Sequence, residues 1–200
     1  MKRTILLATK NKDKVTELKQ LLGDLPIELV SASDMDHIPT VEEDQETLQG
    51  NALKKAREYA MAAGLPALAD DTGLEVDALN GEPGVNSARF SGPDATYAGN
   101  VRKLLNEMQD VPEQKRAARF RTVIAFVDGD TEHTVDGLCE GTILDHTSGD
   151  KGFGYDPVFY YPPLGKTFAE MDTEEKNEIS HRGRALVKIK EFLQNYLQQP

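Results

Sequence analysis

Short apolar runs alternate with helical stripes over the first third of the chain. Residues 4–8 form a brief, partly β-branched apolar run, and the apolar positions within 15–22 recur at helical spacing. Residues 27–30 predict a second strand, and the stripe over 47–63 predicts a long helix. Strands that alternate with helices in this way are typical of parallel βαβ units.

The middle of the chain has a different pattern. Residues 67–69 predict a small strand with Asp70 and Asp71 at its carboxyl end, where ligands gather in α/β sheets. The segments 119–127 and 132–144 predict a hairpin, and consecutive strands favour antiparallel pairing. We therefore predict an α/β fold with a mixed twisted sheet flanked by helices.

Further helices are predicted toward the C-terminus. Apolar positions at helical spacing mark residues 96–108 and 186–197, while a glycine-rich turn over 149–154 precedes a strand over 158–160. No internal repeat or low-complexity tract interrupts the sequence. We expect one domain over residues 1–200.

Charge and cysteine content restrict the class of protein. The 200 residues include 23 Lys and Arg against 34 Asp and Glu, for a formal net charge of −11, which argues against a nucleic-acid partner. The single cysteine, Cys139, cannot form an intramolecular disulfide. The N-terminal apolar run is too short for a secretion signal, and no stretch reaches the length of a membrane span. We expect a cytoplasmic protein without a membrane partner.

The turn after the first strand offers polar and basic side chains directly before a helix N-terminus. Free N–H groups and the helix dipole at such a position favour an anion. Lysines that only solvate a surface helix explain the pattern equally well, and the turn lacks the glycine spacing of a Walker loop. The candidate phosphate ligands are Thr9, Lys10, Asn11, Lys12 and Lys14.

Two acidic clusters are candidate metal sites, because Mg²⁺ prefers carboxylates when it also holds substrate phosphates. The loop cluster, Glu42–Asp44 with Glu46, is equally typical of a solvated loop. The pair Asp70–Asp71 is the stronger candidate, since a cation would relieve the repulsion and desolvation of adjacent acids after a buried strand. Asn51 and Lys55, one helical turn apart, either point toward the same phosphate or belong to an exposed polar face.

Aromatic and basic residues follow in the last quarter of the chain. Phe153 and Tyr155 lie in a glycine-flanked turn, where an aromatic ring presents its face to a flat ligand or is simply buried in a hairpin. Lys176, His181 and Arg182 come next, and each of them alone has an ordinary structural explanation.

Taken together, seven segments resemble the inosine/xanthosine triphosphate pyrophosphatase family, which clears deaminated purine nucleoside triphosphates from the nucleotide pool. The segments occur in that family's order and spacing across nearly the whole chain. They are ATKNKDKVTEL, ETLQGNALKKA, ALADDTGLEVDAL, PGVNSARFSG, ARFRT, GFGYDPVF and FAEMDTEEKNEISHRGRAL.

The resemblance implies two lobes around a central substrate cleft, a homodimer, and Mg²⁺-dependent hydrolysis of ITP, dITP and XTP to the nucleoside monophosphate and pyrophosphate. It implies Asp71 as the catalytic and metal-linked carboxylate and Glu43 as the second metal ligand, with Asp70 adjacent. The implied partners are small purine nucleoside triphosphates. The implied substrate-binding residues are Thr9, Lys10, Asn11, Lys12, Asp13, Lys14, Lys55, Thr72, Phe153, Gly154, Tyr155, Asp156, Lys176, His181 and Arg182.

Some positions depart from the family pattern. Lys10 and Asp13 stand where small residues are common, and Gly50 stands where an acid is common. Glu42 and Glu43 are adjacent, so their metal roles are interchangeable on sequence alone. Two other functions stay open: a nucleotide-sugar transferase, which also uses adjacent aspartates and Mg²⁺, and a nucleotide-binding module without activity.

Overall fold

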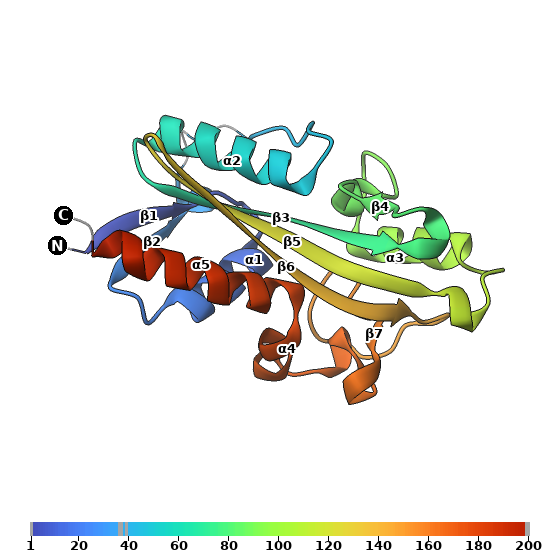
Figure 1. Ribbon diagram of the computed structural model, residues 1–200. Coiled ribbons are helices and arrows are strands. Elements are labelled where there is room, and N and C mark those ends of the chain that lie inside the picture. Colours follow the sequence, from blue (N-terminus) through green and yellow to red (C-terminus); the bar gives the residue numbers. More distant parts are fainter. Residues whose placement is uncertain (1, 36–37, 39, 199–200) are drawn as a thin grey trace. The chain divides into compact units, whose positions relative to one another are not determined.

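The computed structural model describes residues 2–35, 38 and 40–198, and these form a mixed sheet with α-helices on its faces (Figure 1). The predicted α/β fold class is therefore confirmed. The strands are β1 Arg3–Leu7, β2 Ile27–Ser31, β3 Ala67–Val76, β4 Pro83–Gly84, β5 Ala117–Asp128, β6 Thr131–Ile143, β7 Phe159–Tyr161 and β8 Lys166–Thr167. The α-helices are α1 Lys12–Leu22, α2 Leu48–Ala63, α3 Tyr97–Glu107, α4 Thr173–Ile179 and α5 His181–Leu197.

The sheet is mixed in the way that the sequence predicts. Its eight strands run in the order β2-β1-β3-β5-β6-β7-β8, with β4 paired to β3. Strand β1 pairs in parallel with β2 and with β3, as expected of the alternating first third of the chain. The pairs β3–β4, β6–β7 and β7–β8 are antiparallel.

Strand β3 differs from its prediction. It does not end before the acidic pair but continues through Asp70 and Asp71 to Val76. Strand β1 pairs with β3 only as far as Leu7, opposite Leu68, so the acids lie past the end of β1 but inside β3. The backbone stays extended there because β5 is the neighbour of β3 on its other side.

The chain divides into two compact units, each with its own hydrophobic core. The first unit comprises residues 1–71, 122–137 and 183–200, and the second comprises 72–121 and 138–182. Ile5, Leu18 and Ile189 belong to the core of the first, and Leu104 and Phe159 to that of the second. One domain over 1–200, and a cleft between two lobes, remain predictions.

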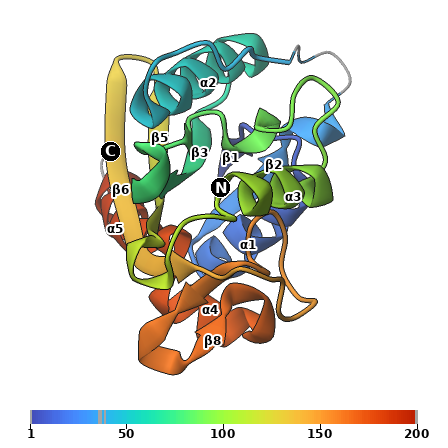
Figure 2. The same cartoon turned by 90° about the vertical axis from the view of Figure 1, so that its right-hand side faces the viewer.

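Helices cover both faces of the strands in the first unit. Helix α2 lies on one face, and α1 and α5 lie on the other (Figures 1 and 2). The stripe of α2 buries Ala52 and Ala56 completely, as its spacing predicts. Thr47 caps the N-terminus of α2 through a hydrogen bond to its Oγ1 from the Gly50 N–H, and Gly64 ends the helix at φ 64°.

The second unit contains α3, α4 and the short strands β7 and β8. Tyr155 is buried there, and its hydroxyl donates to the carbonyl oxygen of Ser87 at 2.9 Å. The same carbonyl accepts a hydrogen bond from the side chain of Asn100 on α3. None of the helices in the described part of the chain has the length and apolarity that a bilayer span requires.

Candidate active site

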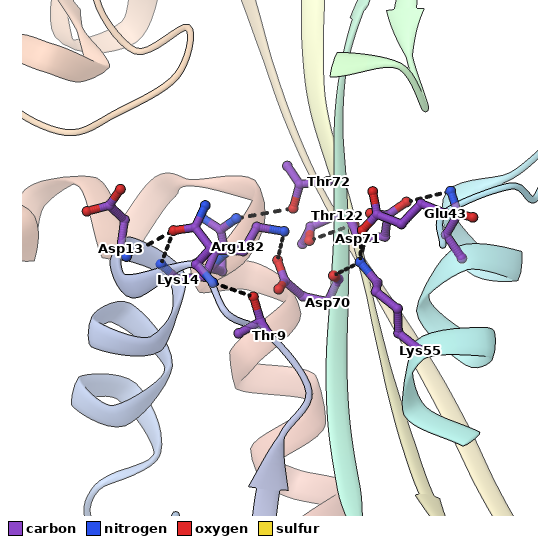
Figure 3. Close-up of polar contacts among 12 residues, drawn as sticks. Thr9, Asp13, Lys14, Glu43, Lys55, Asp70, Asp71, Thr72, Thr122 and Arg182 are labelled. Carbon is purple, nitrogen blue, oxygen red and sulfur yellow. Dashed lines mark hydrogen bonds and ion pairs between the residues drawn. The ribbon is translucent and has the colours of Figure 1, made fainter. Parts of the chain in front are cut away.

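Strand β3 directs its two adjacent acids to opposite faces of the sheet, because successive side chains of a strand alternate. Oδ2 of Asp70 lies 3.0 Å from Nζ of Lys14 on α1, and Oδ1 of Asp71 lies 3.0 Å from Nζ of Lys55 on α2 (Figure 3). The two carboxylates therefore do not converge on one point, and a cation that both of them would bind remains a prediction. Each acid instead meets its own lysine.

Polar groups hold Asp71 from several sides. The side-chain amide of Asn51 donates to Oδ2 at 3.1 Å, Lys55 donates to Oδ1, and Thr122 donates to the backbone carbonyl at 3.0 Å. Burial raises the pKa of the Asp71 carboxyl, Lys55 opposes this and Glu43 adds to it, and the net pKa lies above the usual value. A carboxylate with a raised pKa is a stronger proton acceptor than an ordinary aspartate.

Lys55 is the charged centre of this group of residues. Its Nζ lies 2.6 Å from Oε1 of Glu43, 3.0 Å from Asp71 and 2.7 Å from the carbonyl oxygen of Asp70. Burial favours the neutral amine, but the surrounding carboxylates outweigh this effect and raise the pKa of Lys55. Glu42 is exposed to solvent, so the geometry supports Glu43 as the second carboxylate of the site.

The turn before α1 is already ordered by its own side chains. Oδ1 of Asn11 caps the helix by accepting from the N–H groups of Asp13 and Lys14. Oγ1 of Thr9 accepts a hydrogen bond from the Asn11 N–H at 3.2 Å. Nζ of Lys10 donates a hydrogen bond to Oγ1 of Thr40, also at 3.2 Å. The Asn11 cap thus occupies N–H groups that the sequence suggested for phosphate.

The charged residues at the start of α1 differ in how far their side chains are exposed to solvent. Lys12 and Asp13 are exposed, whereas Lys14 is half-buried and reaches Asp70. Lys14, one of the predicted phosphate ligands of the turn, therefore contacts an acid of β3.

A second group of predicted residues comes together inside the second unit. The ring of Phe153 has Nζ of Lys176 at 5.0 Å and the guanidinium carbon of Arg182 at 5.7 Å from its centroid. Oδ2 of Asp156 accepts from Nζ of Lys176 at 2.7 Å and from the Phe153 N–H at 2.8 Å. The result is an aromatic ring flanked by cations.

Neighbouring residues complete this group. Nη2 of Arg182 donates to Oγ1 of Thr72 at 3.1 Å. The ring of His181 stacks on Phe120 at 4.6 Å between centroids, which orients the imidazole. Gly154 adopts a positive φ of 63° in the turn, while Tyr155 points into the core.

Sequence reasoning missed several residues that shape these groups. Gly152 has φ +70°, and a Cβ there would overlap Oδ2 of Asp156, so the glycine permits the close approach of this carboxylate. Thr122 and Phe120 carry no signal, because threonine and phenylalanine are ordinary strand residues.

The carboxylates of the first group are chemically suited to Mg²⁺. Glu43 and Asp71 both reach the same ammonium of Lys55, so their oxygens converge on one place. Within the described residues, no cluster of three or more His, Cys, Asp or Glu side chains has metal-binding geometry. Two carboxylates still fit Mg²⁺, which usually keeps several waters and takes further ligands from substrate phosphates.

Comparison with known proteins identifies the family. The sequence profile of the Ham1 family matches residues 5–192, which is most of the chain. This chain belongs to the Ham1 family. The resemblance seen in the seven sequence segments is thereby confirmed.

Curated relatives and solved structures of the Ham1 family agree with this assignment. A dITP/XTP pyrophosphatase of Caldanaerobacter subterraneus subsp. tengcongensis is 46% identical over 197 residues, covering 98% of each chain. A dITP/XTP pyrophosphatase of Geobacter sulfurreducens is 49% identical over 190 residues, covering 94% of this chain and 96% of the relative. The structure of a HAM1 protein from Coxiella burnetii superimposes with a TM-score of 0.89 at 41% identity, covering 96% of this chain and 99% of that one.

Proposed function

We propose that this Ham1-family protein hydrolyses deaminated purine nucleoside triphosphates, namely ITP, dITP and XTP, to the nucleoside monophosphate and pyrophosphate. The observation that carries the proposal is the buried Asp71 carboxyl, held by Lys55 and Asn51 beside Glu43. The names of the curated relatives, dITP/XTP pyrophosphatase, support the same reaction and substrate class.

The first group of residues is assigned to the triphosphate. Lys14 and Lys55 offer positive charge to the phosphates, and Asp71 orients a water and takes its proton as the water oxygen attacks phosphorus. The bond between the α and β phosphates then breaks, and pyrophosphate leaves. Mg²⁺, held by Glu43 and Asp71, would supply charge neutralisation of the phosphate oxygens when bound.

The second group is assigned to the nucleoside. Phe153 offers a ring face to the base, and Arg182 and His181 offer hydrogen-bond donors. The 6-oxo group of hypoxanthine or xanthine accepts from such donors, whereas the 6-amino group of adenine sets donor against donor. A polar mismatch of this kind discriminates by roughly 10⁴-fold.

Pyrophosphate release from five nucleotides tests the proposal. ITP, dITP and XTP should be cleaved well and ATP and GTP poorly, with Mg²⁺ present and at mildly alkaline pH, and a chelator should stop the reaction. Equal rates on all five would contradict the base selection but keep the chemistry. No release from any of them would favour the binding module, or the transferase if a sugar is transferred instead.

Assembly and location belong to the same proposal. The resemblance to the inosine/xanthosine triphosphate pyrophosphatases supports a homodimer. The single cysteine, Cys139, is buried and supports a reducing compartment such as the cytoplasm. The acidic net charge of −11 supports small nucleotides, rather than nucleic acid, as the partners.

A further inference from the structure

Asn51 is a completely buried polar residue of α2, one helical turn before Lys55. Its side chain connects two separate segments of the first unit. Oδ1 accepts from the backbone N–H of Gln45 at 2.9 Å, and Nδ2 donates to Oδ2 of Asp71 at 3.1 Å. A buried amide with both ends satisfied is held in a single orientation.

That orientation follows from the chemistry of the partners. The N–H of Gln45 can only donate, so the amide oxygen of Asn51 must face it. The NH₂ group is thereby directed at Asp71, whose carboxylate oxygen can accept. Rotating the amide by half a turn would set oxygen against oxygen at Asp71 and N–H against N–H at Gln45.

Gln45 belongs to the same loop as Glu43, two residues further along the chain. The Asn51 side chain therefore joins the loop that carries one carboxylate to the strand that carries the other. Lys55 also connects Glu43 and Asp71, through an ion pair with each of them, but a flexible ammonium group tolerates many geometries. The amide has a fixed plane and two directed bonds.

We propose that Asn51 is a positioning residue that holds the Asp71 carboxylate in register with the Glu43 loop. The inference rests on the proposed function, because it assigns Asn51 to the geometry of that same reaction. Asn51 is completely buried and acts through its hydrogen bond to Asp71. Partners behind the reacting groups typically contribute 10–100-fold to activity or metal affinity.

A general role in fastening the loop is the competing explanation, and the chain offers a matched control for it. Lys54 lies on the same helix, and its Nζ lies 2.8 Å from Oδ1 of Asp44 in the same loop. This ion pair does not involve Asp71. Lys54→Met removes this exposed contact, which is of a kind that contributes little to stability.

Three variants separate the two explanations. Asn51→Asp keeps the shape of the side chain and an oxygen for the Gln45 N–H, but replaces the donor to Asp71 with a second carboxylate oxygen. Asn51→Ala removes both bonds. Lys54→Met removes the exposed ion pair to Asp44 of the loop, together with the ion pair to Glu58 on α2. Circular dichroism and thermal melting establish the folded fraction of each variant.

Two readouts are needed, one on the reaction and one on the protein alone. Steady-state hydrolysis of ITP with Mg²⁺ gives kcat and KM, and backbone amide exchange by NMR reports the Gln45 N–H without metal or nucleotide. For Asn51→Asp we expect kcat about 10–100-fold lower with KM little changed, and a Gln45 amide as protected as in the wild type. For Asn51→Ala we expect the same loss of kcat and faster exchange at Gln45, and for Lys54→Met a wild-type kcat.

Several results would overturn the inference. They are a wild-type kcat in Asn51→Asp, an equal loss in Lys54→Met, or a loss in the Asn51 variants that only follows their unfolded fraction. If Asn51→Ala does not fold, the isosteric Asn51→Asp decides, and unfolding of both would show that the amide serves stability alone. A wild-type protein that leaves ITP intact contradicts the proposed function itself, whereas active wild type with unaffected variants contradicts only the role of Asn51.

Discussion

Asp71 has a donor on each carboxylate oxygen and a raised pKa. We expect Asp71→Asn to lower kcat for ITP by about 10²–10⁴-fold, because an amide cannot take the proton of the attacking water. Nucleotide binding should persist, since Lys14 and Lys55 keep their charges. Pyrophosphate release gives the rate and calorimetry gives the binding, and a variant with a near-normal rate would show that another group is the base.

Glu42 and Glu43 are adjacent acids with different surroundings, which makes them a matched pair. We expect Glu43→Gln to raise the Mg²⁺ concentration needed for half-maximal activity by about 10–100-fold, because Glu43 shares Lys55 with Asp71. Glu42→Gln should change it little, since Glu42 is exposed. A Mg²⁺ titration of the rate checks both, and the reverse result would exchange the two roles.

Among the helices and strands, those with strong periodicity were predictable from the sequence. Helix α2 appears where the apolar stripe predicts it, and β5 and β6 follow one another as the predicted hairpin requires. The path of β3 through Asp70 and Asp71 was not predictable. Acids are poor strand formers, and tertiary contacts compensate for them, among them the neighbouring strand and the two lysines.

The candidate site shows a similar division. Residue types and motif order identified Asp71, Lys55 and the cations near Phe153, because charge and aromatic character are visible in the sequence. Which acid meets which lysine depends on the strand's alternation and on helices that pack from opposite faces. These pairings depend on tertiary structure, and the sequence around Asp70 and Asp71 does not reveal them.

Helical capping gives a pH-dependent prediction in the second unit. Thr167 and Glu170 form a capping box on the 3₁₀ turn Phe168–Glu170, and Ser148 donates to Glu170 at 2.6 Å. The hydrogen bond from Ser148, followed by that from the Thr167 backbone, holds the pKa of Glu170 below its usual value. The stabilisation from this group is therefore present above the ordinary glutamate pKa, and it is lost as the pH falls through the lower, folded-state pKa.

We expect Glu170→Gln to unfold at lower urea concentration than the wild type at pH 7. The difference should shrink at pH 3, because a protonated glutamate resembles glutamine. Glu178→Gln, at an exposed position of α4, is the control. A difference that is equal at both pH values would mean that the charge of Glu170 does not stabilise the cap.

Over the entire chain, the seven motif segments predicted the family, because their order and spacing extend from the first turn to the last helix. Assembly is less accessible to such reasoning. We expect a homodimer, and light scattering at micromolar concentration should give twice the chain mass of 22.1 kDa. A value equal to the chain mass would refute the dimer.

Successive side chains of β3 point to opposite faces of the sheet, and this alternation also determines which mutations the gene can tolerate. Substitutions change one contact at a time, but one residue inserted before Asp70 would move every later side chain of β3 to the other face. Asp70 would then face Lys55, and Asp71 would face Lys14. Both acids would still be present in the sequence, each beside the wrong lysine, so a length change as small as one codon in this strand would be more harmful than most replacements of its residues.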